Sequence, residues 1–228
     1  RALLRGRRPC LLRRLEPISR AIQIFRRSGN SSAGRGSGAT GLESVPGRNR
    51  YRRFPVGTGI FASVRSGEKA AGKMREVVFR RAVPEDAAAI SELEILCFSS
   101  PWSKEAFTKE LAENPAAWYL VGEIEGRIVA SAGLWLIVDQ GHIINVAVHP
   151  DFRRQGIGKA LIAEMLRRTE PEGVVSYTLE VRTSNRAAIA LYLEFGFCPA
   201  GIRKNYYENP AEDALLLWRN LPSDEATS

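Results

Sequence analysis

Residues that bind metals or form disulfides are scarce in this chain. Its 228 residues include 3 Cys and 2 His. The cysteines, at positions 10, 97 and 198, show neither Cys-x-x-Cys nor His-paired spacing. That pattern argues against a disulfide framework and a zinc site, and it predicts a reducing compartment, which we take to be the cytoplasm. We interpret His142 and His149 as structural and expect neither a metal nor a cysteine nucleophile.

Long apolar runs are also missing. No stretch reaches the roughly 18 residues that a membrane helix needs, so we expect no membrane partner. Acidic residues are scarce only at the start: residues 1–73 hold 17 Lys and Arg against 3 Asp and Glu, whereas residues 74–228 hold 16 against 22. The net charge of +8 therefore comes from residues 1–73, the leader. Because the remainder is acidic, it suits a cationic partner better than a nucleic acid.

The leader shows no sustained apolar period and contains "RSGNSSAGRGSGATG", rich in Gly, Ser and Arg. Such a composition does not build a core, so we expect a disordered basic leader at 1–73 and a single folded domain at 74–228. Three interpretations of the leader stay open, in this order: translated upstream sequence, because Met74 directly precedes the first strand pattern; an organellar transit peptide; and a nucleic-acid-binding tail. Import into an organelle would require the second.

Residues 74–228 alternate between strand and helix patterns. We expect strands at 75–82, 118–124, 127–138, 142–150, 174–181, 202–207 and 213–220, and helices at 83–98, 99–115, 155–169 and 184–195. The resulting order, β-α-α-β-β-β-α-β-α-β-β, predicts a mixed α/β domain around a central sheet.

The segment "HPDFRRQGIGKALIAEMLRR", residues 149–168, places a glycine turn between a strand and a helix. Free backbone N–H groups and the positive end of a helix dipole meet at such a point, so it predicts an anion site, most naturally for phosphate. The turn is not a P-loop, because Arg153 and Ala160 stand where that motif needs Gly and a hydroxyl residue. Leu161 likewise departs from the dinucleotide-binding fingerprint.

Two segments resemble the GCN5-related N-acetyltransferase (GNAT) family: "VAVHPDFRRQGIGKALI" and "LEVRTSNRAAIALYLEFGF". The resemblance covers most of residues 76–219. The pieces "FSSPWSKEAF", "IRKNYY" and "EDALLL" narrow it to the RimI type, the ribosomal-protein-alanine N-acetyltransferases. It implies the GNAT acyl-CoA N-acyltransferase fold, a mixed sheet with splayed middle strands flanked by helices. Departures are the spelling "SSPWS" for the commoner Phe-Pro-Trp-Ser, Arg203-Lys204 before Asn205, and the leader.

The resemblance implies acetyl-CoA as a substrate. Its pyrophosphate would lie at the turn formed by Arg153, Arg154, Gln155, Gly156, Ile157, Gly158 and Lys159. Its pantetheine would lie along the backbone of Asn145, Val146, Ala147 and Val148, with Asn185 near the pantetheine-phosphate region. Tyr206 and Tyr207 would line the peptide side, although strand packing explains these two tyrosines nearly as well.

Acetyl transfer to an amine needs a base for the ammonium and an acid for the leaving thiolate. Alternation in "VVSYTLEV" puts Glu180 on the polar side of its strand, where a surface or salt-bridged carboxylate is the commoner fate. Helical spacing puts Tyr192 in a stripe with Asn185 and by itself favours a core aromatic. The family resemblance implies instead that Glu180 is the general base and Tyr192 the general acid.

We therefore expect a peptide α-N-acetyltransferase that acts on the N-terminal alanine of the eighteenth protein of the small ribosomal subunit, as a monomer whose folded domain contacts no nucleic acid. The nearest alternative is the same fold acting on a small-molecule amine. A non-catalytic coenzyme A-binding domain and a nucleic-acid binder led by residues 1–73 are the alternatives from other classes.

Overall fold

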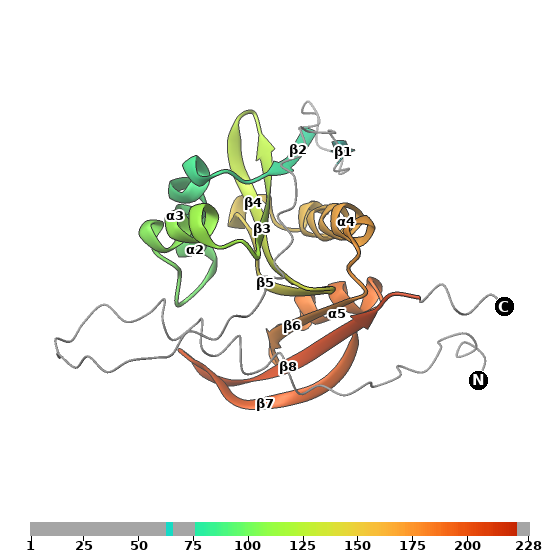
Figure 1. Ribbon diagram of the computed structural model, residues 1–228. Helices are drawn as coiled ribbons and strands as arrows, with labels where there is room; N and C mark the ends of the chain where they lie inside the picture. Colours follow the sequence, from blue (N-terminus) through green and yellow to red (C-terminus); the bar gives the residue numbers. More distant parts are fainter. Residues whose placement is uncertain (1–62, 66–75, 223–228) are drawn as a thin grey trace, which may run out of the picture. The chain divides into compact units, whose positions relative to one another are not determined.

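The computed structural model describes residues 63–65 and 76–222, which belong to one compact unit (Figure 1). Its strands are β1 Ser63–Arg65, β2 Glu76–Arg81, β3 Ala117–Ile124, β4 Arg127–Ile137, β5 Gln140–Val148, β6 Ser176–Arg182, β7 Cys198–Glu208 and β8 Ala211–Asn220. Its helices are α2 Ala87–Cys97, α3 Lys104–Glu113, α4 Ile157–Thr169 and α5 Arg186–Glu194, with short 3-10 turns at Pro84–Asp86, Pro150–Phe152 and Glu170–Glu172. Every expected strand and helix is present, in the expected order.

The strands form one mixed sheet in the order β1-β2-β3-β4-β5-β6-β8-β7. β5 and β6 run parallel, and the other neighbouring pairs run antiparallel. Ser63–Arg65, which we expected to belong to the leader, pairs with β2. Three residues are too few to show a strand period, so the sequence pattern could not reveal this edge strand. The rest of the leader lies outside the described residues.

Local signals fix several element ends. The Ser103 side chain caps α3 by accepting a hydrogen bond from Ala106 N. Glu125 and Gly126 both have positive φ, 52° and 79°, which is the backbone of a two-residue hairpin turn between β3 and β4. Gly196 follows α5 with φ 82°, the left-handed conformation in which many helices end.

The two faces of the sheet are covered by different helices (Figure 1). The apolar stripe of α4 packs with α5 against one face and forms the larger core; buried members include Ile157, Leu161, Ile162, Met165 and Leu166. On the other face α2 and α3 form a smaller cluster around Ile90, Phe107 and Tyr119. Helices on both faces of a mixed sheet are the arrangement that the sequence predicts.

The middle of the sheet contains a bulge in β5, on the side that pairs with β4, and β5 and β6 separate beside it. The β4–β5 register passes from Gly133–Asn145 to Leu134–Ile143, so Ile144 is an additional residue on β5. A bulge bends the strand that carries it. The β5–β6 ladder ends at the pair Ile143–Leu179, and beyond it the two strands continue without further pairing. The predicted splay of the middle strands is thus present, and the bulge lies directly beside it.

Candidate active site at the splayed strands

The edge of β5 that faces the opening is formed by Asn145, Val146, Ala147 and Val148, which pair with β4 on their other side. The Val148 carbonyl accepts hydrogen bonds from Arg153 Nε at 2.9 Å and Cys97 Sγ at 3.4 Å rather than from a strand. No residue of β6 pairs with β5 beyond Ile143–Leu179, so this edge of β5 faces the opening, as binding of a pantetheine amide along the strand requires.

The glycine turn produces the expected helix start. Gly156 caps α4 with φ 80°, and Arg154 before it has φ 63°. The first helical bond of α4 runs from Ala160 N to Gly156 O at 3.0 Å. The N–H groups of Ile157, Gly158 and Lys159 come before this bond and therefore have no acceptor within the helix. A Cβ on Gly156 would meet no atom within 4 Å, so space stays open at the cap. This helix start fits a pyrophosphate through its backbone.

Side chains of the turn mostly contact the protein itself. The Arg153 guanidinium holds Val148 O and Cys97 Sγ, and Gln155 Nε2 donates to Asp151 O at 3.1 Å. Lys159 Nζ lies 2.7 Å from the Glu194 carboxylate on α5, and both of these side chains are exposed. Backbone groups, rather than these three side chains, are what the turn offers in this conformation.

Glu180 lies on the polar side of β6, as the alternation predicts. Its side chain is only 5% exposed, with Arg203 Nη1 2.8 Å from Oε1 and His142 Nε2 3.3 Å from Oε2. His142 Nδ1 in turn lies 2.7 Å from Thr178 Oγ1, so the imidazole is held between β5 and β6. Glu180 is thus a buried, salt-bridged carboxylate, and His142 helps to orient it.

Tyr192 is both a core aromatic and a candidate acid. It is 7% exposed, and its ring packs edge-on against Phe197 at 5.5 Å. Burial, with a smaller contribution from Tyr207, raises the pKa of Tyr192 well above its ordinary value. A raised pKa keeps the hydroxyl protonated, which is the state that a proton donor needs.

Asn185 has a structural task in this conformation. It caps α5, because its Oδ1 accepts from Ala188 N at 3.1 Å. The preceding loop is held by Glu212, which accepts from Ser184 N at 2.6 Å and Thr183 Oγ1 at 3.0 Å. The Ser184 N–H is the main cause that lowers the pKa of Glu212 to about 2. Sequence reasoning noticed Glu212 only as part of "EDALLL" and gave it no role.

The two tyrosines of β7 lie where the strand departs from regular pairing. The β7–β8 register shifts between Arg203 and Tyr207. The rings of Tyr206 and Tyr207 pack edge-on at 5.1 Å, and the Arg182 guanidinium lies 4.2 Å above the Tyr207 ring. Tyr207 also donates to the Glu180 carbonyl at 3.3 Å. Both tyrosines are half-buried, and Tyr207 directly adjoins the candidate base.

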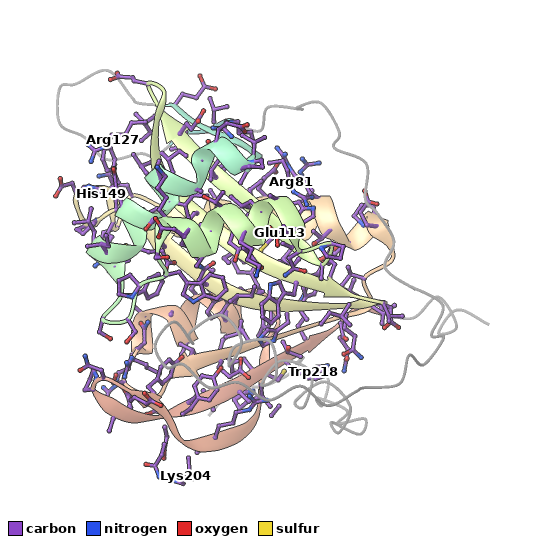
Figure 2. All side chains as sticks on the ribbon, turned by 60° about the vertical axis from the view of Figure 1, so that its left-hand side comes forward. Arg81, Glu113, Arg127, His149, Lys204 and Trp218 are labelled. Atoms are coloured by element: carbon purple, nitrogen blue, oxygen red, sulfur yellow. The ribbon has the colours of Figure 1, made fainter. Side chains whose placement is uncertain are left out.

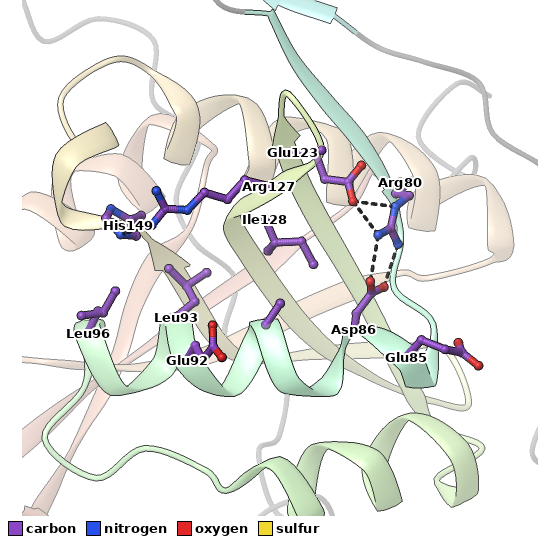
Figure 3. Close-up of a pocket in the computed structure, with 12 residues that line it drawn as sticks. Arg80, Glu85, Asp86, Glu92, Leu93, Leu96, Glu123, Arg127, Ile128 and His149 are labelled. Atoms are coloured by element: carbon purple, nitrogen blue, oxygen red, sulfur yellow. Dashed lines mark hydrogen bonds and ion pairs between the residues drawn. The ribbon is translucent and has the colours of Figure 1, made fainter.

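A separate cavity of about 310 Å³ lies between α2 and the β3–β4 hairpin (Figure 3). None of the predicted site residues lines it. Its charged groups are largely paired: Arg80 Nη1 lies 2.7 Å from Asp86 Oδ2, and Arg127 Nη2 lies 2.9 Å from His149 Nε2. Figure 2 shows Arg127 and His149 at one end of the sheet and Lys204 of β7 at the other. We therefore place the candidate chemistry at the splayed strands and not in this cavity.

Among residues 63–65 and 76–222, no three His, Cys, Asp or Glu side chains converge to hold a metal ion. None of the helices in this part of the chain is both long and apolar enough to cross a membrane.

Comparison with known proteins agrees with this geometry. Residues 87–197 match the acetyltransferase (GNAT) family. A Bacillus subtilis (strain 168) protein is 42% identical over 134 residues, which are 59% of this chain and 89% of that protein. The [ribosomal protein bS18]-alanine N-acetyltransferase of Escherichia coli (strain K12) is 37% identical over 134 residues, 58% of this chain and 89% of that enzyme.

A solved structure is similar to this chain in fold and sequence. The crystal structure of the ribosomal-protein-S18-alanine N-acetyltransferase from Escherichia coli superimposes with a TM-score of 0.61 at 32% identity, covering 67% of this chain and 98% of that one. The family uses acetyl-CoA. On the fold, the site and these relatives together, the chain belongs to the GNAT family and is an N-acetyltransferase.

Proposed function

We propose that this protein transfers the acetyl group of acetyl-CoA directly to the N-terminal amine of a protein, and that its acceptor is the N-terminal alanine of ribosomal protein bS18. The observation that carries the proposal is the opening between β5 and β6, where pairing ends at Ile143–Leu179 and Glu180 is the next residue of β6. The 37% identity to the Escherichia coli enzyme that is named for this reaction supports the choice of acceptor.

Glu180 and Tyr192 divide the proton transfers between them. Acetyl-CoA supplies an activated acyl carbon, at which a C–N bond forms as the C–S bond breaks. Glu180 accepts, directly or through a water molecule, the proton that the attacking ammonium loses. The Tyr192 hydroxyl provides the proton that the departing sulfur gains, and backbone N–H groups of Asn145–Val148 polarise the acyl oxygen.

The environment of Glu180 suits an α-amine better than a lysine. Its charge is already compensated by Arg203, so Glu180 faces the attacking amine as a buried, paired carboxylate. An α-amine, with a pKa of about 7.7–8.0, is roughly half neutral at pH 8, whereas a lysine, with a pKa of about 10.4, is less than about 1% neutral. The α-amine therefore needs far less help from a base before it can attack.

The acceptor would bind to a domain of net negative charge. Residues 74–228 hold 22 acidic and 16 basic side chains, which favours association with a basic ribosomal-protein segment. The Tyr206–Tyr207 pair beside Glu180 would line its path. We place this reaction in the cytoplasm and expect the enzyme to act as a monomer.

The test uses the full chain, acetyl-CoA and two basic peptides, with mass as the measurement. One peptide begins with a free alanine; the other is identical but blocked at its N-terminus and carries lysines. We expect one acetyl group on the first peptide and none on the second. Acetylation of lysines, or of a polyamine but neither peptide, would contradict the proposal. So would binding of acetyl-CoA without transfer to any amine.

A further inference from the structure

A buried carboxylate on α2 has no part in the proton transfers described above. Glu94 is 3% exposed, although Ile95 and Leu96 beside it on the helix are 63% and 52% exposed. Its Oε1 accepts a hydrogen bond from Asn145 Nδ2 at 2.7 Å, and its carboxylate also accepts from the backbone N–H of Trp102. An inward-facing carboxylate beside exposed apolar residues is costly unless it is hydrogen-bonded, and here two donors meet it.

The first donor belongs to the opening in the sheet. Asn145 directly follows the bulge residue Ile144 and is the first residue of the free β5 edge. Its other amide atom, Oδ1, is buried without a hydrogen-bond partner among the described residues. Opposite it stands Gly133, where a Cβ would lie 2.5 Å from Asn145 Oδ1. Among the described residues, Glu94 is therefore the group whose hydrogen bond sets the orientation of the Asn145 side-chain amide.

The second donor belongs to the α2–α3 loop, residues 98–103. The Trp102 peptide is held on both sides, because Ser91 Oγ donates to Trp102 O at 3.1 Å while Glu94 accepts from Trp102 N. At its other end the loop contacts the β7–β8 turn, where the Ser99 hydroxyl donates to Asn209 O. Arg182 Nη2, on β6 two residues after Glu180, donates to the same carbonyl at 2.8 Å. The loop thus runs from Glu94 towards the side of the site that carries Glu180.

We propose that Glu94 is a positioning residue that locks the α2–α3 loop to Asn145, so that the acceptor peptide and the β5 edge keep a fixed relation to each other. This inference rests on the proposed function, because it assigns the loop to the acceptor side of the same site. Its physical content is a single carboxylate that needs two donors and joins two segments of the chain that lie 43 residues apart, Trp102 and Asn145.

The experiment is a reciprocal exchange of hydrogen-bonding groups, measured at pH 8 on the full chain with the free-alanine peptide. Glu94→Gln turns one acceptor into a donor that faces the Asn145 amide. We expect it to raise the KM for the peptide about tenfold or more, as loss of a charged hydrogen bond does, with kcat changed less than about threefold. Asn145→Asp alone opposes two carboxylates and should be more severe.

Combining Glu94→Gln with Asn145→Asp restores both bonds, because the new amide donates to the new carboxylate and still accepts from Trp102 N. We expect the peptide KM of the double variant to return to within about threefold of the wild type, a rescue that a general loss of packing would not give. Glu92→Gln is the matched control, since Glu92 is exposed on the same helix and lines the separate cavity.

A milder variant covers the case in which Glu94→Gln does not fold. Ser91→Ala removes only the bond to Trp102 O, and we expect a two- to fivefold rise in peptide KM, about the worth of one neutral hydrogen bond. A peptide KM for Glu94→Gln equal to that of Glu92→Gln, or a double variant no better than Glu94→Gln, would overturn the inference alone. A wild-type protein that acetylates no peptide would overturn the proposed function and this inference with it.

Discussion

The two faces of the central sheet are built from different chemistry. On the α4 and α5 face, the buried side chains are almost all apolar, as Leu161 and Met165 illustrate at 0% exposure. On the α2 and α3 face, the apolar cluster is small and buried polar side chains surround it, among them Glu94 at 3% and His142 at 6%. Burial of apolar area stabilises the first face, whereas buried polar groups on the second contribute little net stability and need partners.

The candidate base and acid come from opposite faces. Glu180 shares the polar face with His142 and Thr178, whereas Tyr192 packs in the apolar core with Phe197. The proposed mechanism needs both side chains at the opening between β5 and β6. In the proposed mechanism the two faces therefore have different tasks: the apolar face provides most of the stability and the acid, and the polar face provides the base and the groups that orient it.

The largest expected effect comes from removing the base and the acid. Glu180→Gln and Tyr192→Phe should each lower kcat by about 100- to 10,000-fold, the range typical of general acid–base catalysis. The melting temperature of Tyr192→Phe should stay close to that of the wild type, because the change is nearly isosteric, whereas Glu180→Gln also breaks the buried ion pair with Arg203 and should melt at a lower temperature. Steady-state kinetics and thermal melting check both points. Undiminished turnover in the combined variant would show that neither residue takes part in the mechanism, and the assignment of the base to one face and the acid to the other would be wrong.

A change in the apolar face should act in the opposite way. Leu161→Ala truncates a side chain that is 0% exposed in the larger core. We expect the free energy of unfolding to fall by about 2–5 kcal/mol, the range for such truncations, with kcat of the folded protein nearly unchanged. Urea unfolding and kinetics at low temperature measure the two quantities. A large loss of kcat without a loss of stability would contradict the proposed division.

The smallest of these effects is a pH dependence of stability on the polar face. Burial raises the pKa of Glu94 to about 7 from an ordinary value of 4.5. Between these pH values Glu94 holds a proton in the folded state that it has lost in the unfolded state, so the stability that Glu94 contributes is fully present below pH 4.5 and is lost as pH rises towards 7. The loss is on the order of 3 kcal/mol at most.

Glu94→Gln should flatten that part of the curve, as measured by urea unfolding between pH 4 and pH 8. The difference between wild type and variant isolates Glu94 from Glu110, whose pKa burial also raises. Because Glu110 contributes in the same direction, the wild-type curve alone would not assign the effect. An unchanged slope in the variant would show that Glu94 is not the buried group that titrates there.

Patterns of local sequence predicted much of this structure. Periodicity located every expected helix and strand, and the glycine turn located the cap of α4 at Gly156. Alternation along β6 put Glu180 on its polar side, where the structure has it. These features depend on residues within a few positions of one another, which is the range over which backbone geometry imposes a pattern.

Contacts between distant segments could not be read in this way. Arg203 reaches Glu180 across β8, and Asn145 meets Glu94 from a residue 51 positions away. The apolar spacing of α2 predicted the helix but gave no sign that Glu94 turns inwards. Ser63–Arg65 forms a strand only because β2 offers it an edge. The roles of the predicted site residues stay predictions until the variants are measured.

The additional residue in β5 has a consequence for how this site could be lost or moved. Ile144 lies on the α2 and α3 side, as does Asn145, whereas Ile143 and Val146 pack with the larger core, so deletion of Ile144 would restore simple alternation along β5 and leave the other residues on their present faces. The ladder between β4 and β5 would then be regular, and β5 would lose the bend that a bulge gives to its strand. A protein designer who idealised β5 would therefore remove the bend that lies directly beside the opening between β5 and β6.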